Sequence, residues 1–431
     1  MLSPEFFVNL CINFYTNTMT EKDTYPVTNI ISKPFPQKDV HGAIAMPVYN
    51  TAAFEFDTAE EMEEAFLGKS GRHTYTRISN PTVEDFESRI QAASGAKHVM
   101  AVASGMAAIS TTFLTIASAG SNIVTTSHLF GNTFSLFYVT LKAFGVEVRF
   151  CNLLDINDIE KNIDENTCAV FTEIITNPHM EIVDLAALSE LAHKKGVPLI
   201  ADTTIVPWPA FLASQWGVDI EIVASTKYIS GGATSIGGLI LDYQSYDWKQ
   251  SQKLHDLAIQ VGNKAFQIKL RSEVSRNIGA MMAPQVAYMQ SLGLETLDLR
   301  FQQAAKTCLE LARFLEKTPQ IKTVKYNGLA SDPFYKISKK QFGDYPGAML
   351  TFSLKDKAEC YAFLNRLKII RRATNLFDNK SLIIHPESTI YGTMSPELKK
   401  MVEVPDDMLR LSVGLERLDD LKADILQALE N

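Results

Sequence analysis

Two kinds of hydrophobic pattern alternate through the middle of this 431-residue chain. Short apolar runs, typical of buried strands, are separated by longer segments whose apolar residues recur at helical spacing. We interpret as strands the runs 99–103, 123–126, 146–150, 169–172, 198–202 and 220–224. We interpret as helices the segments 105–119, 131–144 and 184–195. The pattern therefore predicts a regular succession of strands and helices.

Alternation of this kind indicates an α/β protein with a mainly parallel sheet that is covered on both faces. Ligands of such sheets bind beyond the carboxyl ends of the strands. The chain is also longer than one hydrophobic core usually supports, so we expect more than one domain. Our predicted division is an N-terminal extension and arm (1–62), a large domain (63–280) and a smaller α+β C-terminal domain (281–431), which opens with a long helix-like run over 283–317.

One lysine stands directly after a predicted strand. The apolar run 220–224 breaks off at Ser225-Thr226-Lys227, and a glycine-rich loop follows. Lysine is seldom buried, and a desolvated amine loses its proton readily, which suits Schiff-base chemistry. An exposed loop lysine is the alternative interpretation. The chemical one is favoured by Asp202, which ends the strand before it, because a lysine for an aldehyde and an aspartate for a pyridinium nitrogen mark a pyridoxal phosphate (PLP) site.

These segments resemble a known enzyme family. Ser225-Thr226-Lys227-Tyr228 with Ser230-Gly231, after Ala201-Asp202-Thr203-Thr204, is similar to the PLP-dependent enzymes of cysteine and methionine metabolism. That family includes cystathionine synthases and lyases, methionine γ-lyase and O-acetylhomoserine sulfhydrylase. The resemblance extends from about Ile44 to the C-terminus. It implies the aspartate-aminotransferase-like fold (fold type I of PLP-dependent transferases), with Lys227 as the catalytic residue.

The resemblance also implies a set of cofactor contacts. They are Tyr75, Arg77, Ser104, Gly105, Met106, Phe130, Asn177, Asp202, Thr204, Ser225, Thr226 and Lys227. Ser104 and Gly105 open a helix after a strand, where backbone N–H groups can bind a phosphate. Asp202 would keep the ring nitrogen protonated, and Asn177 would bond the phenolic oxygen. Ala224 stands where a serine is frequent, so that phosphate contact is either lost or taken by Ser225.

Tyr75 and Arg77 carry an expectation about assembly. In the family these two residues reach across a dimer interface to the phosphate in the other subunit, and an arginine fork with a phenol suits a phosphate dianion. The resemblance thus implies a homo-oligomer with shared active sites, usually a dimer of dimers (a homotetramer). The Asn80-Pro81-Thr82 segment that follows is interpreted only as a turn and helix cap.

Three features bear on the reaction. Phe130 stands where most of the family has tyrosine, so the stacking ring is kept and its hydroxyl is lost. Asn375-Leu-Phe-Asp378 has the Asn-x-x-Asp form of the sulfhydrylases, whereas lyases tend to have Ser-Leu-Gly-Gly. Arg410, in Leu-Arg-Leu-Ser-Val-Gly-Leu-Glu, matches the family's arginine for the substrate α-carboxylate. We therefore expect Asn375 and Arg410 to bind substrate.

The activity that this resemblance favours is a γ-replacement in methionine biosynthesis. O-acetylhomoserine and a sulfur nucleophile would give homocysteine and acetate, as in a homocysteine synthase. Acetate needs little acid assistance to leave, whereas a thiolate leaving group benefits from a proton donor, so the missing hydroxyl of Phe130 favours this activity over a lyase. Methionine or cystathionine γ-lyase, cystathionine γ-synthase and a non-catalytic protein of the same fold remain alternatives. The acyl group and the sulfur donor (sulfide, a thiol or a carrier protein) stay open.

Composition limits the partners. Hydrophobic residues make up 46% of the chain and charged residues 21%, with a net charge of −8. This acidic balance argues against nucleic acid and anionic membranes as partners, and no apolar stretch reaches the length of a membrane span. The five cysteines are scattered without a CxxC pair, and the histidines include no HExxH. We therefore expect reduced thiols, a cytoplasmic location and no metal site.

Residues 1–43 have the character of an extension. Their apolar positions could suggest a signal peptide, yet no Lys or Arg precedes Lys22, so the positive region of such a peptide is missing. Met19 is a candidate start of the natural protein, because an ordinary polar N-terminus follows it. Whether residues 1–18 belong to that protein is left open by the sequence.

Overall fold

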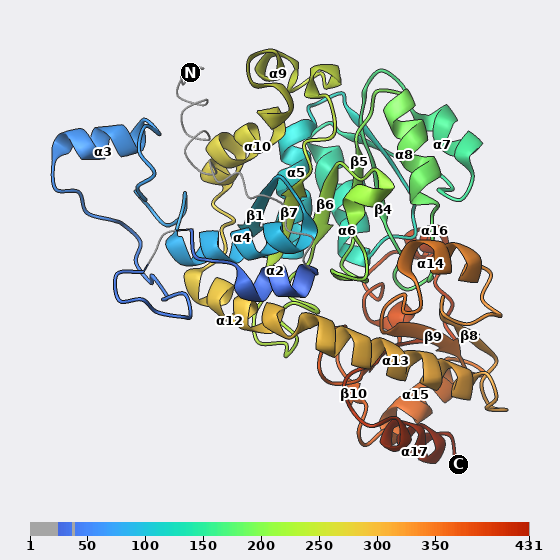
Figure 1. Ribbon diagram of the computed structural model, residues 1–431. Coiled ribbons are helices and arrows are strands. Elements are labelled where there is room, and N and C mark those ends of the chain that lie inside the picture. The colour runs from blue at the N-terminus through green and yellow to red at the C-terminus, as the bar shows by residue number, and fades with distance from the viewer. Residues whose placement is uncertain (1–24, 37–38, 431) are drawn as a thin grey trace.

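The computed structural model describes residues 25–36 and 39–430, and its larger part is built on a seven-stranded sheet (Figure 1). The strand order is β1-β7-β6-β5-β4-β2-β3. In the part of the sheet with the order β6-β5-β4-β2-β3, every neighbouring pair of strands is parallel. Strand β7 pairs antiparallel with both β6 and β1. The mainly parallel sheet of the α/β class is thus confirmed. The strands are β1 (His98–Val102), β2 (Asn122–Thr125), β3 (Glu147–Phe150), β4 (Thr167–Glu173), β5 (Leu199–Asp202), β6 (Ile220–Val223) and β7 (Gly238–Asp242).

The central strands are covered on both faces because alternate side chains enter two separate hydrophobic clusters. In β5, Leu199 and Ala201 join the first cluster and Ile200 joins the second. Helices that contribute to the first are α2 (Pro26–Ser32), α4 (Pro81–Ser94), α7 (Ile156–Asn162), α8 (Leu185–Lys194), α12 (Pro284–Glu295) and α13 (Leu297–Leu315). Those that contribute to the second include α5 (Gly105–Ile116), α6 (Gly131–Ser135), α9 (His255–Val261) and α10 (Ala265–Lys269).

Two of the expected helices are divided. The segment predicted over 131–144 begins as α6 and continues as a wider π-helix, Leu136–Leu141. The run predicted over 283–317 forms α12 and α13, which meet at Thr296. Arg300 fixes this junction, since its guanidinium donates to the carbonyl of Gly293 at 2.6 Å and to that of Tyr228 at 2.7 Å. The break between the helices is therefore tied to the chain that follows β6.

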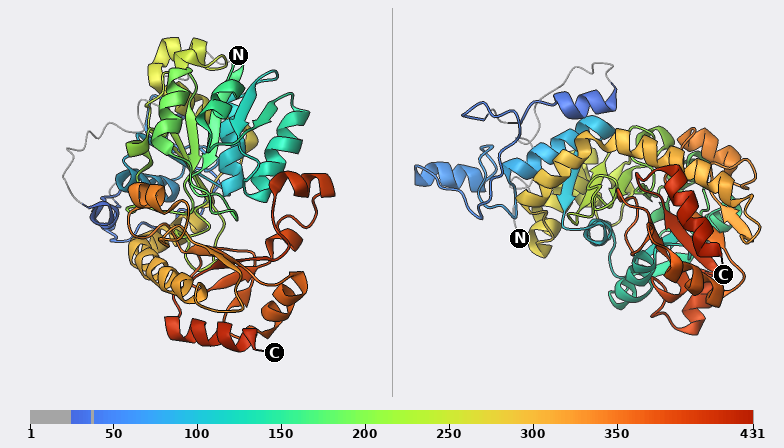
Figure 2. Two further views of the ribbon diagram at one scale, coloured as in Figure 1. Left: turned by 90° about the vertical axis from the view of Figure 1, so that its right-hand side faces the viewer. Right: turned by 90° about the horizontal axis from the view of Figure 1, so that it is seen from below.

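A second sheet lies in the C-terminal part, with the strand order β10-β11-β12-β9-β8. Its strands are β8 (Thr323–Lys325), β9 (Met349–Ser353), β10 (Arg371–Arg372), β11 (Leu382–Ile384) and β12 (Met408–Ser412). The helices of this part are α14 (Tyr335–Phe342), α15 (Lys357–Arg366), α16 (Pro396–Val402) and α17 (Leu418–Leu429). Figure 2 shows this smaller part beside the larger one. Its mixture of helices and short strands agrees with the expected α+β C-terminal domain. The boundaries at 62/63 and 280/281 stay a prediction.

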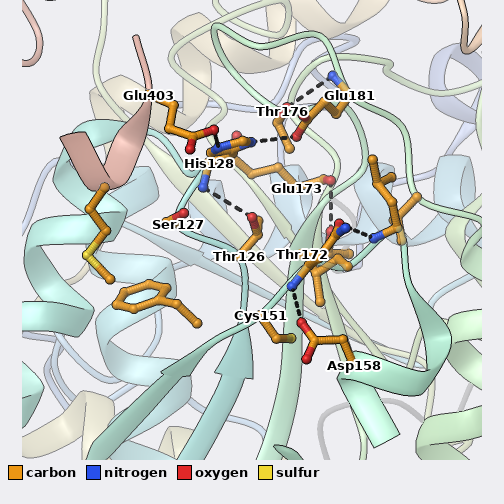
Figure 3. A pocket seen from close by; sticks show the side chains of 16 residues that line it. Thr126, Ser127, His128, Cys151, Asp158, Thr172, Glu173, Thr176, Glu181 and Glu403 are labelled. Atoms are coloured by element: carbon orange, nitrogen blue, oxygen red, sulfur yellow. Dashed lines mark hydrogen bonds and ion pairs between the residues drawn. The ribbon is translucent and has the colours of Figure 1, made fainter. Parts of the chain in front are cut away.

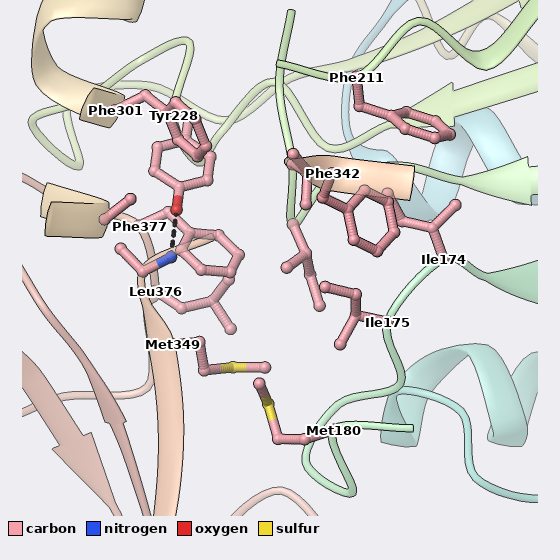
Figure 4. Close-up of a cluster of buried hydrophobic side chains, with 14 of the residues drawn as sticks. Ile174, Ile175, Met180, Phe211, Tyr228, Phe301, Phe342, Met349, Leu376 and Phe377 are labelled. Atoms are coloured by element: carbon pink, nitrogen blue, oxygen red, sulfur yellow. Dashed lines mark hydrogen bonds between the residues drawn. The ribbon is translucent and has the colours of Figure 1, made fainter. Parts of the chain in front are cut away.

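A buried aromatic cluster joins the two parts (Figure 4). Tyr228 stacks on Phe377 with ring centroids 4.4 Å apart and meets the edge of Phe301 at 5.4 Å. Its hydroxyl accepts a hydrogen bond from the backbone N–H of Ala348 at 2.9 Å. Because Tyr228 directly follows Lys227, this packing fixes the backbone that carries the lysine.

The segment around helix α3 (Ala59–Phe66) stands apart from the body. The helix and the chain on either side of it project from the remainder in Figure 1 and in the right-hand view of Figure 2. Large apolar side chains are exposed there, including Ile44 (97%) and Phe66 (48%). Within residues 25–36 and 39–430, no helix combines the length and apolar character needed to cross a membrane. Met19 and residues 1–18 lie outside the described residues.

Candidate active site

A cavity of about 1100 Å³ lies at the carboxyl ends of β4, β5 and β6, where α5 and α6 begin. Loops of the C-terminal part, including 374–376, complete its wall. The sequence-predicted residues that line it are Ser104, Gly105, Met106, Phe130, Asn177, Asp202, Thr204, Thr226, Lys227 and Asn375. The structure thus brings together side chains that are far apart in sequence, at the edge where a parallel sheet binds ligands.

Lys227 lies in the turn after β6 and points its amine into this cavity. Its Nζ donates a hydrogen bond to Oδ1 of Asn375 at 2.7 Å. Burial and the positive charge of Arg410 lower the pKa of Lys227 to about 8, while the carboxylates of Asp202 and Asp378 act in the opposite direction. A lysine with such a pKa is partly neutral near pH 7, so it can attack an aldehyde or accept a proton.

Asp202 ends β5 at the cavity wall. Its Oδ1 accepts the backbone N–H of Thr204 at 3.0 Å, and the Thr204 hydroxyl accepts the N–H of Ala224 at 2.8 Å. These bonds connect the end of β5 with the turn that carries Lys227. Burial raises the pKa of Asp202, and the bond from Thr204 and the charge of Lys227 oppose this rise. A cation placed against this carboxyl would stabilise its charged form.

The first turn of α5 forms another part of the wall. Ser104 caps the helix by accepting the N–H of Ala107 at 3.0 Å, and the N–H groups of Gly105 and Met106 belong to the helix end that has no intrahelical acceptors. A Cβ on Gly105 would lie 2.8 Å from Cβ of Ala224, so only glycine lets this helix approach the turn before Lys227. The arrangement suits an anion such as phosphate.

Arg410 comes from β12 and is only 1% exposed. Its guanidinium donates to Oδ1 of Asn177 at 3.2 Å and to the carbonyl of Thr374 at 3.1 Å. Its Nε is buried and has no hydrogen-bond partner among the described residues. Burial lowers the pKa of Arg410 to about 10. Arg410 does not itself line the cavity, but its partners Asn177 and Thr374 do. A buried guanidinium with an unpaired donor, next to such a wall, can bind a carboxylate.

Sequence reasoning missed Glu173 as a site residue. It ends β4, lines the cavity and is 6% exposed. Its carboxylate accepts the backbone N–H of Phe130 at 2.6 Å and that of Asn177 at 3.1 Å. Burial and the charge of Asp202 raise the pKa of Glu173 to about 8, and the two N–H donors oppose this rise. Its place at the carboxyl end of a strand was the available signal.

A second cavity of about 590 Å³ adjoins the active-site cavity, and Glu173 lines both of them. Figure 3 shows its polar wall, where His128 bonds Glu181 at 2.7 Å and lies 3.5 Å from Glu403. The ring of His128 stacks on that of His179 with centroids 4.0 Å apart. Glu173 therefore lies in the partition between two cavities.

Three of the expected cofactor contacts do not line the active-site cavity of this chain. Tyr75 is 43% exposed, and the guanidinium of Arg77 lies 5.4 Å from the centre of the Tyr75 ring. Arg77 also donates to the carbonyl of Arg276 at 2.5 Å. Ser225 is fully buried, and its hydroxyl has no partner among the described residues. Thr226 and Ala224 line the cavity instead, so the expectation that Ser225 takes over the phosphate contact receives no support from its position.

These residues fit PLP. The helix end of α5 offers phosphate donors, and Lys227 offers an amine with a lowered pKa for the aldehyde. Asp202 offers a carboxylate for the ring nitrogen, and Phe130 offers a flat apolar face without a hydroxyl. Each group of the cofactor has a matching chemical partner around one cavity of sufficient size.

Comparison with known proteins agrees with this fit. The family model described as "Cys/Met metabolism PLP-dependent enzyme" matches residues 27–430. O-acetyl-L-homoserine sulfhydrylase 1 of Thermus thermophilus is 38% identical over 89% of this chain and 94% of its own length. L-methionine gamma-lyase of Fusobacterium nucleatum is 36% identical over 91% of this chain and 95% of its own.

Solved structures give the same result. The O-acetylhomoserine sulfhydrylase of Wolinella succinogenes is 47% identical, with a TM-score of 0.74 over 82% of this chain and 99% of its own. A Campylobacter jejuni structure described as an O-acetylhomoserine (thiol)-lyase is 31% identical, with a TM-score of 0.88 over 95% of this chain and 100% of its own, and it carries a pyridoxyl-lysine-monophosphate. The match over nearly the whole chain means that this protein belongs to the PLP-dependent enzymes of cysteine and methionine metabolism.

Proposed function

We propose that this protein is an O-acetylhomoserine sulfhydrylase, which forms homocysteine and acetate from O-acetylhomoserine and a sulfur nucleophile in methionine biosynthesis. The observation that carries the proposal is Phe130 in the cavity wall. Among the described residues of this subunit, no tyrosine, histidine or cysteine lines the cavity, and the carboxyl of Glu173 is held by the N–H groups of Phe130 and Asn177. The face on which Phe130 stands therefore offers no phenol to protonate a leaving group. Acetate, as a weakly basic carboxylate, leaves without such help.

Arg410 and Lys227 have the central roles in this proposal. The guanidinium of Arg410 binds the α-carboxylate of the substrate, while Asn177 and the Thr374 carbonyl hold the guanidinium in place. This contact orients Cα toward Lys227. The neutral amine of Lys227 then takes the proton from Cα, which its pKa of about 8 permits near neutral pH.

The remaining side chains support this proton transfer. Bound PLP supplies a protonated ring that accepts the electron pair left at Cα. With PLP bound, Asp202 would hold the proton at the ring nitrogen, Thr204 and Phe130 would contact the ring, and Asn177 would bond its phenolic oxygen. Ser104, Gly105, Met106 and Thr226 bind the phosphate. When the C–O bond at Cγ breaks, acetate takes its electron pair, and the sulfur nucleophile bonds to the same carbon. Lys227 then returns the proton to Cα, so that the product differs from the substrate only at Cγ.

The test is a panel of O-acetyl-, O-succinyl- and O-phosphohomoserine, each with sulfide, cysteine, an alkyl thiol and a thiocarboxylate-bearing carrier protein as sulfur donor. We expect the acetyl ester to give the highest kcat/KM for homocysteine formation. Methionine alone distinguishes the second candidate, a γ-lyase, which is favoured by the similarity to the Fusobacterium enzyme. Efficient release of α-ketobutyrate from methionine, with little homocysteine from any ester, would overturn the proposal. Preference for the succinyl ester with cysteine would indicate a cystathionine γ-synthase.

The same proposal includes a homo-oligomer, a dimer of dimers, in which Tyr75 and Arg77 complete the site of the neighbouring subunit. Support comes from the exposure of Tyr75 and from the apolar side chains exposed along the projecting segment around α3. Large exposed apolar surfaces usually mark protein interfaces. A division at 62/63 and 280/281 and a cytoplasmic location, in keeping with the scattered cysteines, are parts of the same proposal.

A further inference from the structure

The loop that carries Phe130 and the loop that carries Asn177 are connected twice. From the sheet, the carboxylate of Glu173 accepts the N–H of Phe130 at 2.6 Å and the N–H of Asn177 at 3.1 Å. From the C-terminal part, the hydroxyl of Tyr391 shares its single proton between the carbonyl of Leu129 at 3.0 Å and that of Asn177 at 3.2 Å. Two buried side chains, one at the end of β4 and one from the C-terminal part, thus join the same two loops.

We propose that Glu173 is a positioning residue for the reaction, and that Glu173 and Tyr391 together form a clasp that sets the stacking face of Phe130 relative to the carboxylate anchor Arg410. This inference rests on the proposed function, because it assumes that Phe130 faces the ring and that Arg410 binds substrate. The clasp reaches Arg410 through Asn177, whose Oδ1 accepts a hydrogen bond from the guanidinium at 3.2 Å.

Both side chains of the clasp are buried, and the neighbouring backbone packs closely against Tyr391. Glu173 is 6% exposed and Tyr391 is fully buried. A Cβ on Gly131 would lie 2.9 Å from the carbonyl oxygen of Ile390, so glycine at this position allows the loop after Phe130 to pass beside Tyr391. A buried N–H that loses its acceptor is costly, so without Glu173 both loops are expected to shift until their N–H groups find other partners.

The chemistry of the carboxylate explains why glutamate is needed. Both oxygens of a carboxyl group carry lone pairs that can accept an N–H, whereas the amide of glutamine accepts on one oxygen and presents an NH₂ group to the other N–H. Glu173→Gln keeps the size of the side chain and removes one of the two bonds. Since a small displacement of reacting groups is costly, the effect should appear in catalysis with little change in folding.

The experiment measures kcat and KM for O-acetylhomoserine in the holoenzymes of wild type, Glu173→Gln and Tyr391→Phe. For Glu173→Gln we expect kcat to fall about 10- to 100-fold and KM to rise, because the ring of Phe130 and the guanidinium of Arg410 are both displaced. Asp424→Asn is the matched control, since Asp424 is also a buried carboxylate that accepts backbone N–H groups, here those of residues 368–370 at 2.8–2.9 Å, and it does not line the active-site cavity. It should stay within about twofold of wild type.

A double variant tests the coupling. If Glu173 and Tyr391 act as one clasp, the loss in the double variant will be clearly smaller than the product of the two single losses. Additive losses would overturn the clasp. A lower melting temperature with unchanged kcat and KM per bound cofactor would also overturn it, because that result describes a structural residue only.

A binding measurement separates this inference from the proposed function. L-norvaline has the α-amino and α-carboxylate groups but no leaving group, and its affinity for the holoenzyme can be measured from absorbance changes. Weaker binding to Glu173→Gln, with unchanged binding to Asp424→Asn, supports the clasp whichever reaction the wild type catalyses. Equal affinities in all three proteins would contradict it. Failure of the wild type to form homocysteine would overturn the proposed function alone.

Discussion

The amine nitrogen of Lys227 lies 2.7 Å from Oδ1 of Asn375, a residue 148 positions away in the sequence. This contact links the turn after β6 to a loop of the C-terminal part. Asn375 also donates from its amide nitrogen to Asp378 at 3.2 Å, which fixes the direction of its oxygen. The asparagine that distinguishes the sulfhydrylase-like motif in this sequence is therefore in direct contact with the lysine assigned to catalysis.

A first prediction concerns pH. The pKa of Lys227 is lowered to about 8, and only the neutral amine attacks an aldehyde. Below this pKa the neutral fraction falls with decreasing pH, so the rate at which cofactor-free protein captures PLP should rise about tenfold per pH unit up to about pH 8 and then level off. The measurement is the growth of visible absorbance after mixing. A rate that keeps rising to pH 10 would contradict the lowered pKa.

Asn375→Leu supplies the matching variant for that experiment. The Asn375 oxygen accepts a hydrogen bond from Nζ and so favours the charged amine, and its removal should move the pH at which the rate levels off below that of the wild type. A shift to higher pH would mean that burial and Arg410 do not control the amine.

The second prediction is that Lys227→Ala abolishes turnover and leaves the fold intact, because the variant lacks the amine that bonds the cofactor and takes the Cα proton. We expect a loss of at least about 10²–10⁴-fold in kcat. Lys336→Ala, which removes an exposed lysine of α14, is the control. Circular dichroism checks the fold. Wild-type turnover by Lys227→Ala would end the assignment of Lys227.

The third prediction tests shared sites. Arg77→Ala should weaken PLP binding, and mixing it with Lys227→Ala should restore part of the activity, because a mixed dimer can assemble one site with both residues intact. Arg313→Ala, which removes an exposed arginine that is paired with Glu310, is the control. If mixed dimers form, as tagged subunits can show, and no activity returns, then Arg77 does not complete a neighbouring site.

The fourth prediction concerns Phe130. If its missing hydroxyl limits the expulsion of thiolates, Phe130→Tyr should raise lyase activity on methionine or cystathionine more than it changes the acetate-dependent reaction. An unsatisfied hydroxyl in a closed site can cost about 1–3 kcal/mol, so the ratio of the two kcat/KM values is the proper measurement. Phe144→Tyr, at an exposed position (66%), should leave the ratio unchanged. An unchanged or reversed ratio in Phe130→Tyr would remove the main argument against a lyase.

Sequence alone determined the class of the fold and most of the cavity wall. A buried strand shows in the sequence as a run of apolar residues, and the run stops where the strand leaves the sheet. Asp202 and Lys227 each stand at the carboxyl end of such a run, which is where a parallel sheet binds ligands. The local pattern therefore placed both residues in one site. The role of Gly105 at the start of a helix was likewise predicted from the sequence, because a helix end that closely approaches a ligand or a strand has no room for a side chain. Such features depend on short stretches of chain.

Only the tertiary structure decided which distant groups meet. Glu173 was overlooked because nothing local shows that its two oxygens accept N–H groups from positions 130 and 177. Ser225 lies two residues before Lys227 in the sequence, yet it is fully buried and does not line the cavity, whereas Thr226 does. Tyr391 and Asn375 reach the site from the C-terminal part through packing. Hydrogen-bond partners across loops depend on the position of whole elements, and the periodicity of a single segment does not contain that information.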